Sequence, residues 1–269
     1  MQWWCSARGI PWSWTWQPYP GVWALVAVLA VGYAWWVAPA AARHQRVWWA
    51  AGLVSLWAGL DWPLGPLGAG YLASVHVVQF LLIGVTAPAF LLLGFPQRLA
   101  RRWLERPRLA ALLGDLSHPA VAFSVFTVVM TVTHWPDVSD ALMASQAGAF
   151  AIDVGWLAAG LWFWWPVIVE VPERPRFGPM LKTAYLAVNG LLVHPPAAVM
   201  LFSEHPVYAT YELAPPIPGV NVLDDQQLAG GIMKVGLAWL MAVGIAVVIW
   251  RWHRGRAVPQ EARGAATSL

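Results

Sequence analysis

Seven apolar stretches, separated by short polar or proline-containing segments, follow one another along this chain of 269 residues. They cover residues 21–40, 47–61, 71–94, 119–136, 145–168, 181–203 and 227–250. An α-helix rises 1.5 Å per residue, so about 20 apolar residues cross the ~30 Å hydrocarbon core of a bilayer. The pattern predicts an all-α, polytopic membrane protein built as a seven-transmembrane helix bundle.

The same pattern divides the chain into three parts. A Trp-rich N-terminal segment, 1–20, precedes the seven-helix membrane domain at 21–252, and a tail, 253–269, follows it. Pro88, Pro195 and Pro196 fall inside apolar stretches. They predict kinks there, because proline removes a backbone hydrogen bond from the helix.

Basic residues predict the orientation of the bundle. Arginine and lysine gather after the first, third, fifth and seventh stretches, whereas acidic residues predominate in the alternate loops. Cytoplasmic loops carry the excess of Lys and Arg, so we expect the N-terminus outside and the C-terminal tail in the cytoplasm. Because the arginines serve orientation, the net charge of +3 gives no sign of nucleic-acid binding. Membrane lipid is the expected surrounding.

Composition agrees with this class of protein. The chain is 59% hydrophobic and only 11% charged, against about 25% charged in soluble proteins. Its 21 tryptophans stand mostly near the ends of the stretches, which is typical of the aromatic belts at membrane interfaces. The single cysteine, Cys5, excludes an internal disulfide and every cysteine-based metal motif.

Four ionisable residues lie inside apolar stretches: His76, Asp153, His194 and Lys234. A charge at bilayer depth costs at least ~2.5–3.5 kcal/mol on insertion scales, so such residues are usually paired, face a cavity or take part in chemistry. In the predicted topology all four lie at similar depth in the outer half of the bilayer. His134, at the end of the fourth stretch, is expected at the outer mouth.

This polar layer allows two interpretations. His76 and His134, with the carboxylate of Asp225 or the thioether of Met233, form a ligand set that copper or zinc accepts. The alternative is that these side chains only form hydrogen bonds between helices, as single polar residues in membrane helices do. For His194, the alternative is a hydrogen bond to carbonyls freed by the prolines that follow it. The residues alone leave both interpretations open.

Asp153 and Lys234 suggest a different arrangement. They carry opposite charges at similar depth on different helices, and each charge alone is costly there. We therefore expect a buried structural ion pair between them.

Several segments resemble the caa3-type cytochrome c oxidase assembly factor family (CtaG-like). They are DWPLGPLGAGYLASVHVVQF from Asp61, THWPDVSDAL from Thr133 and DDQQLAGGIMK from Asp224, and the resemblance extends to about Trp250. It implies a multi-pass protein of the bacterial inner (plasma) membrane that helps to mature a haem-copper oxidase. Copper would reach the oxidase from the outer face. The resemblance matches His76, His134, Asp225 and Met233 to family positions.

The chain also departs from the family pattern. Phe80 stands where a second histidine of the third stretch is expected. Ala149 and Asp153 occupy the places of a histidine pair in the fifth stretch, and Lys234 replaces an aromatic residue. These departures indicate that part of the metal site has been replaced.

Three functions follow in order of support. The first is an assembly factor that assists copper delivery to a haem-copper oxidase. The second is a non-catalytic accessory subunit packed against an oxidase or another respiratory membrane complex, with the metal site lost. A transporter is least supported, because spans three to seven offer almost no polar groups in their inner halves. We expect no enzyme, since no nucleophile–base set or phosphate-binding glycine loop appears.

Overall fold

The computed structural model describes residues 2–106, 118–169, 177–192 and 194–266, and all regular structure within these ranges is helical. The longer helices are α1 (Pro20–Trp36), α2 (Arg43–Leu60), α8 (Pro119–Thr133), α10 (Gln146–Ile168), α11 (Pro179–Leu191) and α14 (Val222–Ala266). The shorter ones are η1 (Ala38–Ala40), α3 (Leu64–Gly70), α4 (Ala73–Phe80), η2 (Leu81–Thr86), α5 (Ala87–Gly94), α6 (Gln97–Leu104), α9 (Pro136–Met143), α12 (Pro195–Phe202) and α13 (Ala209–Glu212).

Within the described ranges, four helical stretches are long and apolar enough to cross a membrane: Ala73–Gly94, Gln146–Ile168, Pro179–Phe202 and Val222–Arg254. Helices α8 and α9 form a fifth if they are taken together, although a bend of 72° separates them. The prediction of an all-helical membrane protein is therefore confirmed. Helix α14 continues through residue 266, so most of the expected tail is helical, while 267–269 lie outside the described residues.

The predicted helix 119–136 ends earlier than expected, at Thr133. Pro136 begins the unpredicted helix α9, and Trp135 before it has extended backbone angles. The residue before a proline is disfavoured in the helical region, so the chain turns at this point. The turn leaves His134 at the corner between α8 and α9.

Two spans are irregular near the prolines that predicted kinks. The third stretch consists of α4, the π-helical segment η2 and α5, with Pro88 just after the π-helical segment. In the sixth stretch, α11 ends at Leu191 and α12 begins at Pro195. His194 occupies the N-cap position of α12.

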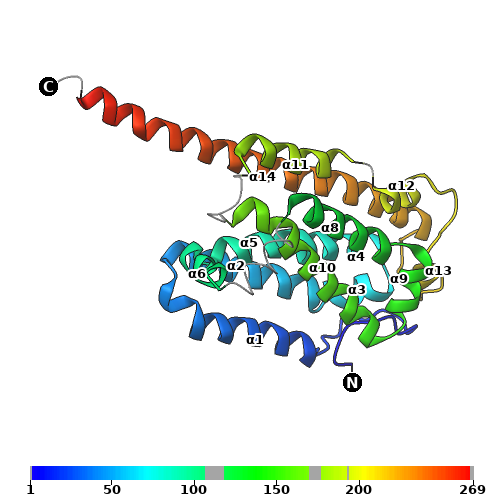
Figure 1. The fold of residues 1–269 in the computed structure, drawn as a ribbon. Helices are drawn as coiled ribbons and strands as arrows, with labels where there is room; N and C mark the ends of the chain where they lie inside the picture. The colour runs from blue at the N-terminus through cyan, green and yellow to red at the C-terminus, as the bar shows by residue number, and fades with distance from the viewer. Residues whose placement is uncertain (1, 107–117, 170–176, 193, 267–269) are drawn as a thin grey trace.

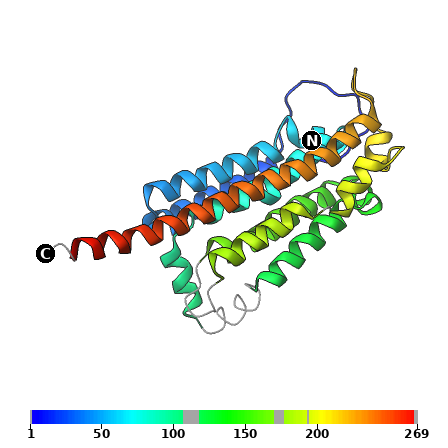
Figure 2. The same ribbon diagram turned by 90° about the horizontal axis from the view of Figure 1, so that it is seen from above.

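The segment α4–η2–α5 lies at the centre of the bundle. Helix α2 packs on α5, helix α10 on α5 and η2, and helix α14 on α4. Helix α8 covers α10, and α11 and α12 lie along α14 (Figure 1). Helices α9, α12 and α13 gather at the same end of the molecule as the N-terminus, and α14 extends beyond the bundle at the other end (Figure 2).

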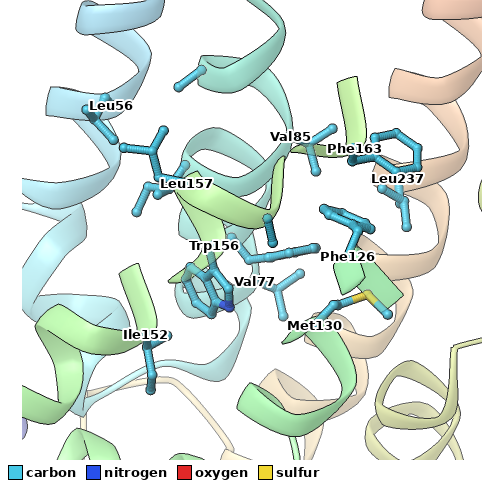
Figure 3. Close-up of a cluster of buried hydrophobic side chains, with 14 of the residues drawn as sticks. Leu56, Val77, Val85, Phe126, Met130, Ile152, Trp156, Leu157, Phe163 and Leu237 are labelled. Atoms are coloured by element: carbon cyan, nitrogen blue, oxygen red, sulfur yellow. The ribbon is translucent and has the colours of Figure 1, made fainter. Parts of the chain in front are cut away.

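The middle of the bundle is an apolar and strongly aromatic core. Trp156, Phe126 and Phe163 are among its fully buried side chains, and they lie close to Val77 and Met130 (Figure 3). The rings of Phe126 and Phe163 are 4.7 Å apart between centroids. Such packing leaves polar atoms in this region without water, so each of them needs a protein partner.

Close contact between two spans depends on a glycine in α10. A Cβ atom added to Gly160 would lie 2.0 Å from the carbonyl oxygen of Gly84. We predict that Gly160→Ala lowers the free energy of unfolding by about 1–3 kcal/mol, the usual cost of overpacking.

Gly155→Ala is the matched control, because its Cβ would meet only Val129 Cγ1, at 3.9 Å. It should leave stability unchanged or raise it by up to ~1 kcal/mol, since Ala favours the helix. Thermal unfolding in detergent measures both variants. Equal shifts would contradict the close contact.

Candidate functional site

The structure brings His76 and His134 together, as the sequence analysis expects of a shared site. His76 lies on α4, and His134 lies at the corner after α8. Their ring centroids are 5.4 Å apart, and the two residues are only 4% and 1% exposed. The turn before Pro136 therefore leaves the ring of His134 in contact with that of His76.

A backbone hydrogen bond orients the ring of His134. Its Nδ1 lies 2.9 Å from the carbonyl oxygen of Met130. A carbonyl only accepts, so Nδ1 carries the proton and Nε2 keeps its lone pair. Nε2 is buried and has no hydrogen-bond partner among the described residues. Histidines that bind metals usually have this arrangement, in which the second ring nitrogen donates to a carbonyl or carboxylate.

His76 is still less satisfied. Both of its ring nitrogens are buried, and within the described ranges neither finds a hydrogen-bond partner. An unsatisfied buried polar atom costs about 1–3 kcal/mol, so native proteins rarely keep one without a reason. Both nitrogens of His76 are therefore available to a ligand.

Aromatic side chains form the walls of this histidine pair. Trp156 from α10 stacks on His134 with a centroid distance of 5.1 Å, and it lies 5.0 Å from His76. Its indole donates a hydrogen bond of 2.8 Å to Thr133 Oγ1. Phe80 packs edge-on against His134 at 4.9 Å. The walls are apolar and would keep water away from an ion held between the rings.

Helix α13 and the residues beside it cover the pair. Tyr208 donates a hydrogen bond of 2.6 Å to the carbonyl of His134, and Tyr211 donates one of 2.8 Å to the carbonyl of Gly68. The carboxylate of Asp140 accepts from the backbone N–H groups that begin α13. Burial raises the pKa of Tyr208 and of Tyr211, so both hydroxyls remain protonated donors at neutral pH.

The other two predicted ligands have different positions. Asp225 accepts hydrogen bonds from the backbone N–H and the hydroxyl of Ser74, near the start of α4. Its carboxylate therefore caps α4, and within the described ranges no three His, Cys, Asp or Glu residues gather around a possible metal. The prediction that Asp225 joins both histidines is corrected. Met233 is completely buried on α14, which packs against α4.

Three further residues of the segments that resemble the family, Gln79, Gln226 and Gly230, contact the backbone of neighbouring elements. Gln79 donates a hydrogen bond of 2.8 Å to the carbonyl of Gly59, and Gln226 accepts one of 2.7 Å from the N–H of Val207. A Cβ on Gly230 would lie 2.7 Å from a backbone nitrogen of α12. These residues fix the elements around the histidines.

The family follows from comparison with known proteins. The family model described as cytochrome c oxidase caa3 assembly factor matches residues 5–255. The chain belongs to this family.

The curated relatives are longer than this chain. Uncharacterized proteins of Mycobacterium bovis and Mycobacterium tuberculosis are each 25% identical over 264 residues, which covers 88% of this chain and 40% of theirs. An uncharacterized protein of Mycobacterium leprae is 24% identical over 207 residues, or 67% of this chain and 30% of its own. The chain thus spans less than half of their length. No solved structure gives a significant match.

This member of the family does not form the predicted ion pair. Asp153 accepts a hydrogen bond of 2.8 Å from the indole of Trp4, and the ammonium of Lys234 binds backbone carbonyls. These carbonyls, 2.8–2.9 Å from Nζ, belong to Gly190, Leu191 and Leu192. These carbonyls have no partner within the helix because α11 ends there. Lys234 donates its hydrogen bonds to them and makes no ion pair with Asp153. The prediction of an Asp153–Lys234 pair is wrong.

The partner of Asp153 carried no local signal in the sequence. Trp4 belongs to the N-terminal segment, which we expected to act as an interfacial anchor, yet it is 1% exposed. The indoles of Trp23 and Trp57 likewise donate to Asp61, at 2.9 and 2.6 Å. Several tryptophans therefore serve as hydrogen-bond donors to buried carboxylates.

Replacing His76 by phenylalanine should stabilise the protein. The new ring has a similar shape and packs among His134, Trp156 and Tyr211, and two unsatisfied nitrogens disappear. We expect a higher midpoint of thermal unfolding in detergent. His44→Phe, at an exposed position of α2, is the control and should give no gain. A loss of stability in His76→Phe would mean that the ring nitrogens have partners.

A double-mutant cycle tests the separation of Asp153 from Lys234. Lys234→Met should destabilise the protein, because three carbonyls lose their donor. Adding Asp153→Asn should change stability by its own single effect, within about 0.5 kcal/mol. A coupling energy above ~1 kcal/mol between the two substitutions, measured by thermal unfolding, would show that Asp153 and Lys234 do interact.

Proposed function

We propose that this protein helps to deliver copper to a haem-copper cytochrome c oxidase during assembly. Membership in the caa3 assembly factor family supports cytochrome c oxidase as the complex that it helps to assemble. The observation that carries the copper role is the pair of buried imidazoles, His76 and His134, whose free nitrogens have no partner in the part of the chain that the structure describes.

The chemistry of the donors favours copper over other metals. Imidazole binds copper well, and the thioether of Met233 on the neighbouring helix would select Cu(I). The two rings and the thioether are uncharged, which suits a monovalent ion in an apolar surrounding. A site with so few ligands holds its ion less firmly than a closed structural site, as a delivery protein requires.

The proposal places the site at the outer face of the bacterial inner membrane. The bundle would cross the bilayer seven times, with the N-terminus outside and the C-terminus in the cytoplasm. His134 lies at the corner before α9 and accepts a hydrogen bond from Tyr208 beside α13. Figure 1 shows α9 and α13 at the end of the bundle opposite the C-terminus. Exposed arginines at the other end, among them Arg251 and Arg254, support a cytoplasmic position for that end.

An accessory subunit of a respiratory complex is the second candidate. The engagement of Asp225 by Ser74 and the presence of Phe80 beside His134 favour it, because both reduce the ligand set. Such a subunit would stay bound to its partner. Co-purification at fixed stoichiometry with a mature complex would therefore favour this second function.

Copper content of the oxidase tests the first function. A strain that lacks the protein is complemented with the wild type, His76→Phe, His134→Asn or the control His44→Asn. Asparagine can keep the hydrogen bond to Met130 while it removes Nε2. We expect normal haem but reduced copper in the oxidase for the two site variants, measured by metal analysis. Full copper with both variants would contradict the proposal.

A further inference from the structure

A cavity lies at the end of the bundle away from the histidine pair, and the proposed copper role does not use it. Its volume is about 180 Å³, which is several times the ~10–15 Å³ that one water needs. Residues of α2, α5, α6, α10 and α14 line it. Figure 1 shows α6 at this end, away from α9 and α13. Five elements thus meet around a space that is large enough for a phosphate group.

The wall of the cavity carries a positive charge. Arg251 of α14 lines it, and the exposed guanidinium makes no hydrogen bond or ion pair with any described residue. Gln45 accepts a hydrogen bond from the N–H of Ala42 through Oε1, so its amide nitrogen remains a donor. The indole of Trp48 is a second donor in the lining, and none of the described lining residues is acidic. Such a wall favours an anion with several acceptor oxygens.

Two helices begin at the cavity. Gln45 lies in the first turn of α2, and Gln97 is the first residue of α6. The N-terminal end of a helix has a positive dipole and N–H groups without partners in the preceding turn, so phosphate groups bind well there. Helices α5 and α10 end nearby, but the carbonyl of Gly94 accepts a hydrogen bond of 3.1 Å from Tyr33, and that of Ile168 accepts one of 3.0 Å from Gln97. These hydrogen bonds reduce the negative potential of the two helix ends.

Exposed apolar side chains stand next to the cavity on two of its helices. Val47 and Trp48 on α2 are 60% and 38% exposed, and Val247 and Trp250 on α14 are 40% and 53% exposed. A free inorganic anion makes no use of such surfaces, whereas acyl chains cover them. A charged cavity beside exposed apolar helix surfaces therefore fits an amphiphile better than a soluble ion.

We propose that this cavity binds the phosphate headgroup of an anionic phospholipid, with Arg251 as its main contact and the acyl chains along α2 and α14. Basic cavities between helices on the cytoplasmic side of membrane proteins bind such headgroups. In the orientation proposed above, the lipid belongs to the cytoplasmic leaflet. The site itself depends neither on that orientation nor on copper.

Native mass spectrometry of the full chain in detergent measures the dissociation constant of phosphatidylglycerol, the lipid used as probe. Arg251→Gln should weaken this binding about tenfold, the usual loss when a hydrogen bond to a charged group is removed. Leu93→Trp fills the cavity without a change of charge and should weaken the binding as well. Thermal unfolding without added lipid shows whether each variant is folded.

Arg254→Gln is the matched control, because it removes the same charge from the same end of α14. Arg254 lies over the ring of Trp250, 4.3 Å from its centroid, and does not line the cavity. This variant should bind phosphatidylglycerol as the wild type does. Equal losses in both arginine variants would show a general attraction of charges and overturn the site. Inorganic phosphate or phosphatidylcholine that binds as tightly as phosphatidylglycerol would overturn the assignment to an anionic lipid.

Discussion

The interior of a membrane protein offers no water, so every polar atom at that depth needs a partner within the protein. The irregular spans of this bundle meet that requirement with side chains from other helices. Trp164 donates to the carbonyl of Val85, and Ser55 donates to that of Leu82, both in the π-helical segment η2. Lys234 does the same for the end of α11. Among the described residues, nitrogens of three histidines lack such a partner, as do a few other buried polar atoms, including both side-chain atoms of Asn189.

Of these unpartnered atoms, the histidine nitrogens are the ones that metal ions bind readily. A buried polar side chain with a purely structural role forms a hydrogen bond to a neighbouring element, as the amides of Gln79 and Gln226 do here. His134 uses Nδ1 in that way, while its Nε2 has no partner among the described residues and its ring contacts that of His76. If the pair binds copper as proposed, stability and function act in opposite directions here, as they often do at sites prepared for a ligand.

The apolar pattern predicted the helices well, because each helix is a local property of the sequence. The fifth stretch, expected at 145–168, is α10 at Gln146–Ile168. Depth along a helix was also sufficient to bring His76 and His134 together. It could not predict which face a residue presents, and for that reason Asp153 and Lys234 were wrongly paired. The contact between Trp4 and Asp153 joins segments far apart in the chain, so no local pattern reveals it.

The hydrogen bond from Tyr208 to the carbonyl of His134 joins the cover of the site to its backbone. The carboxylate of Asp140, on α9, accepts hydrogen bonds from the first N–H groups of α13. Helix α9 follows the corner that carries His134. His134 and the α13 segment that covers it are thus held together by hydrogen bonds and move as one unit. A protein that binds the loop between α12 and α14 would therefore shift the main chain of His134. The position of the imidazole would change with it, although the bound protein does not contact the ring.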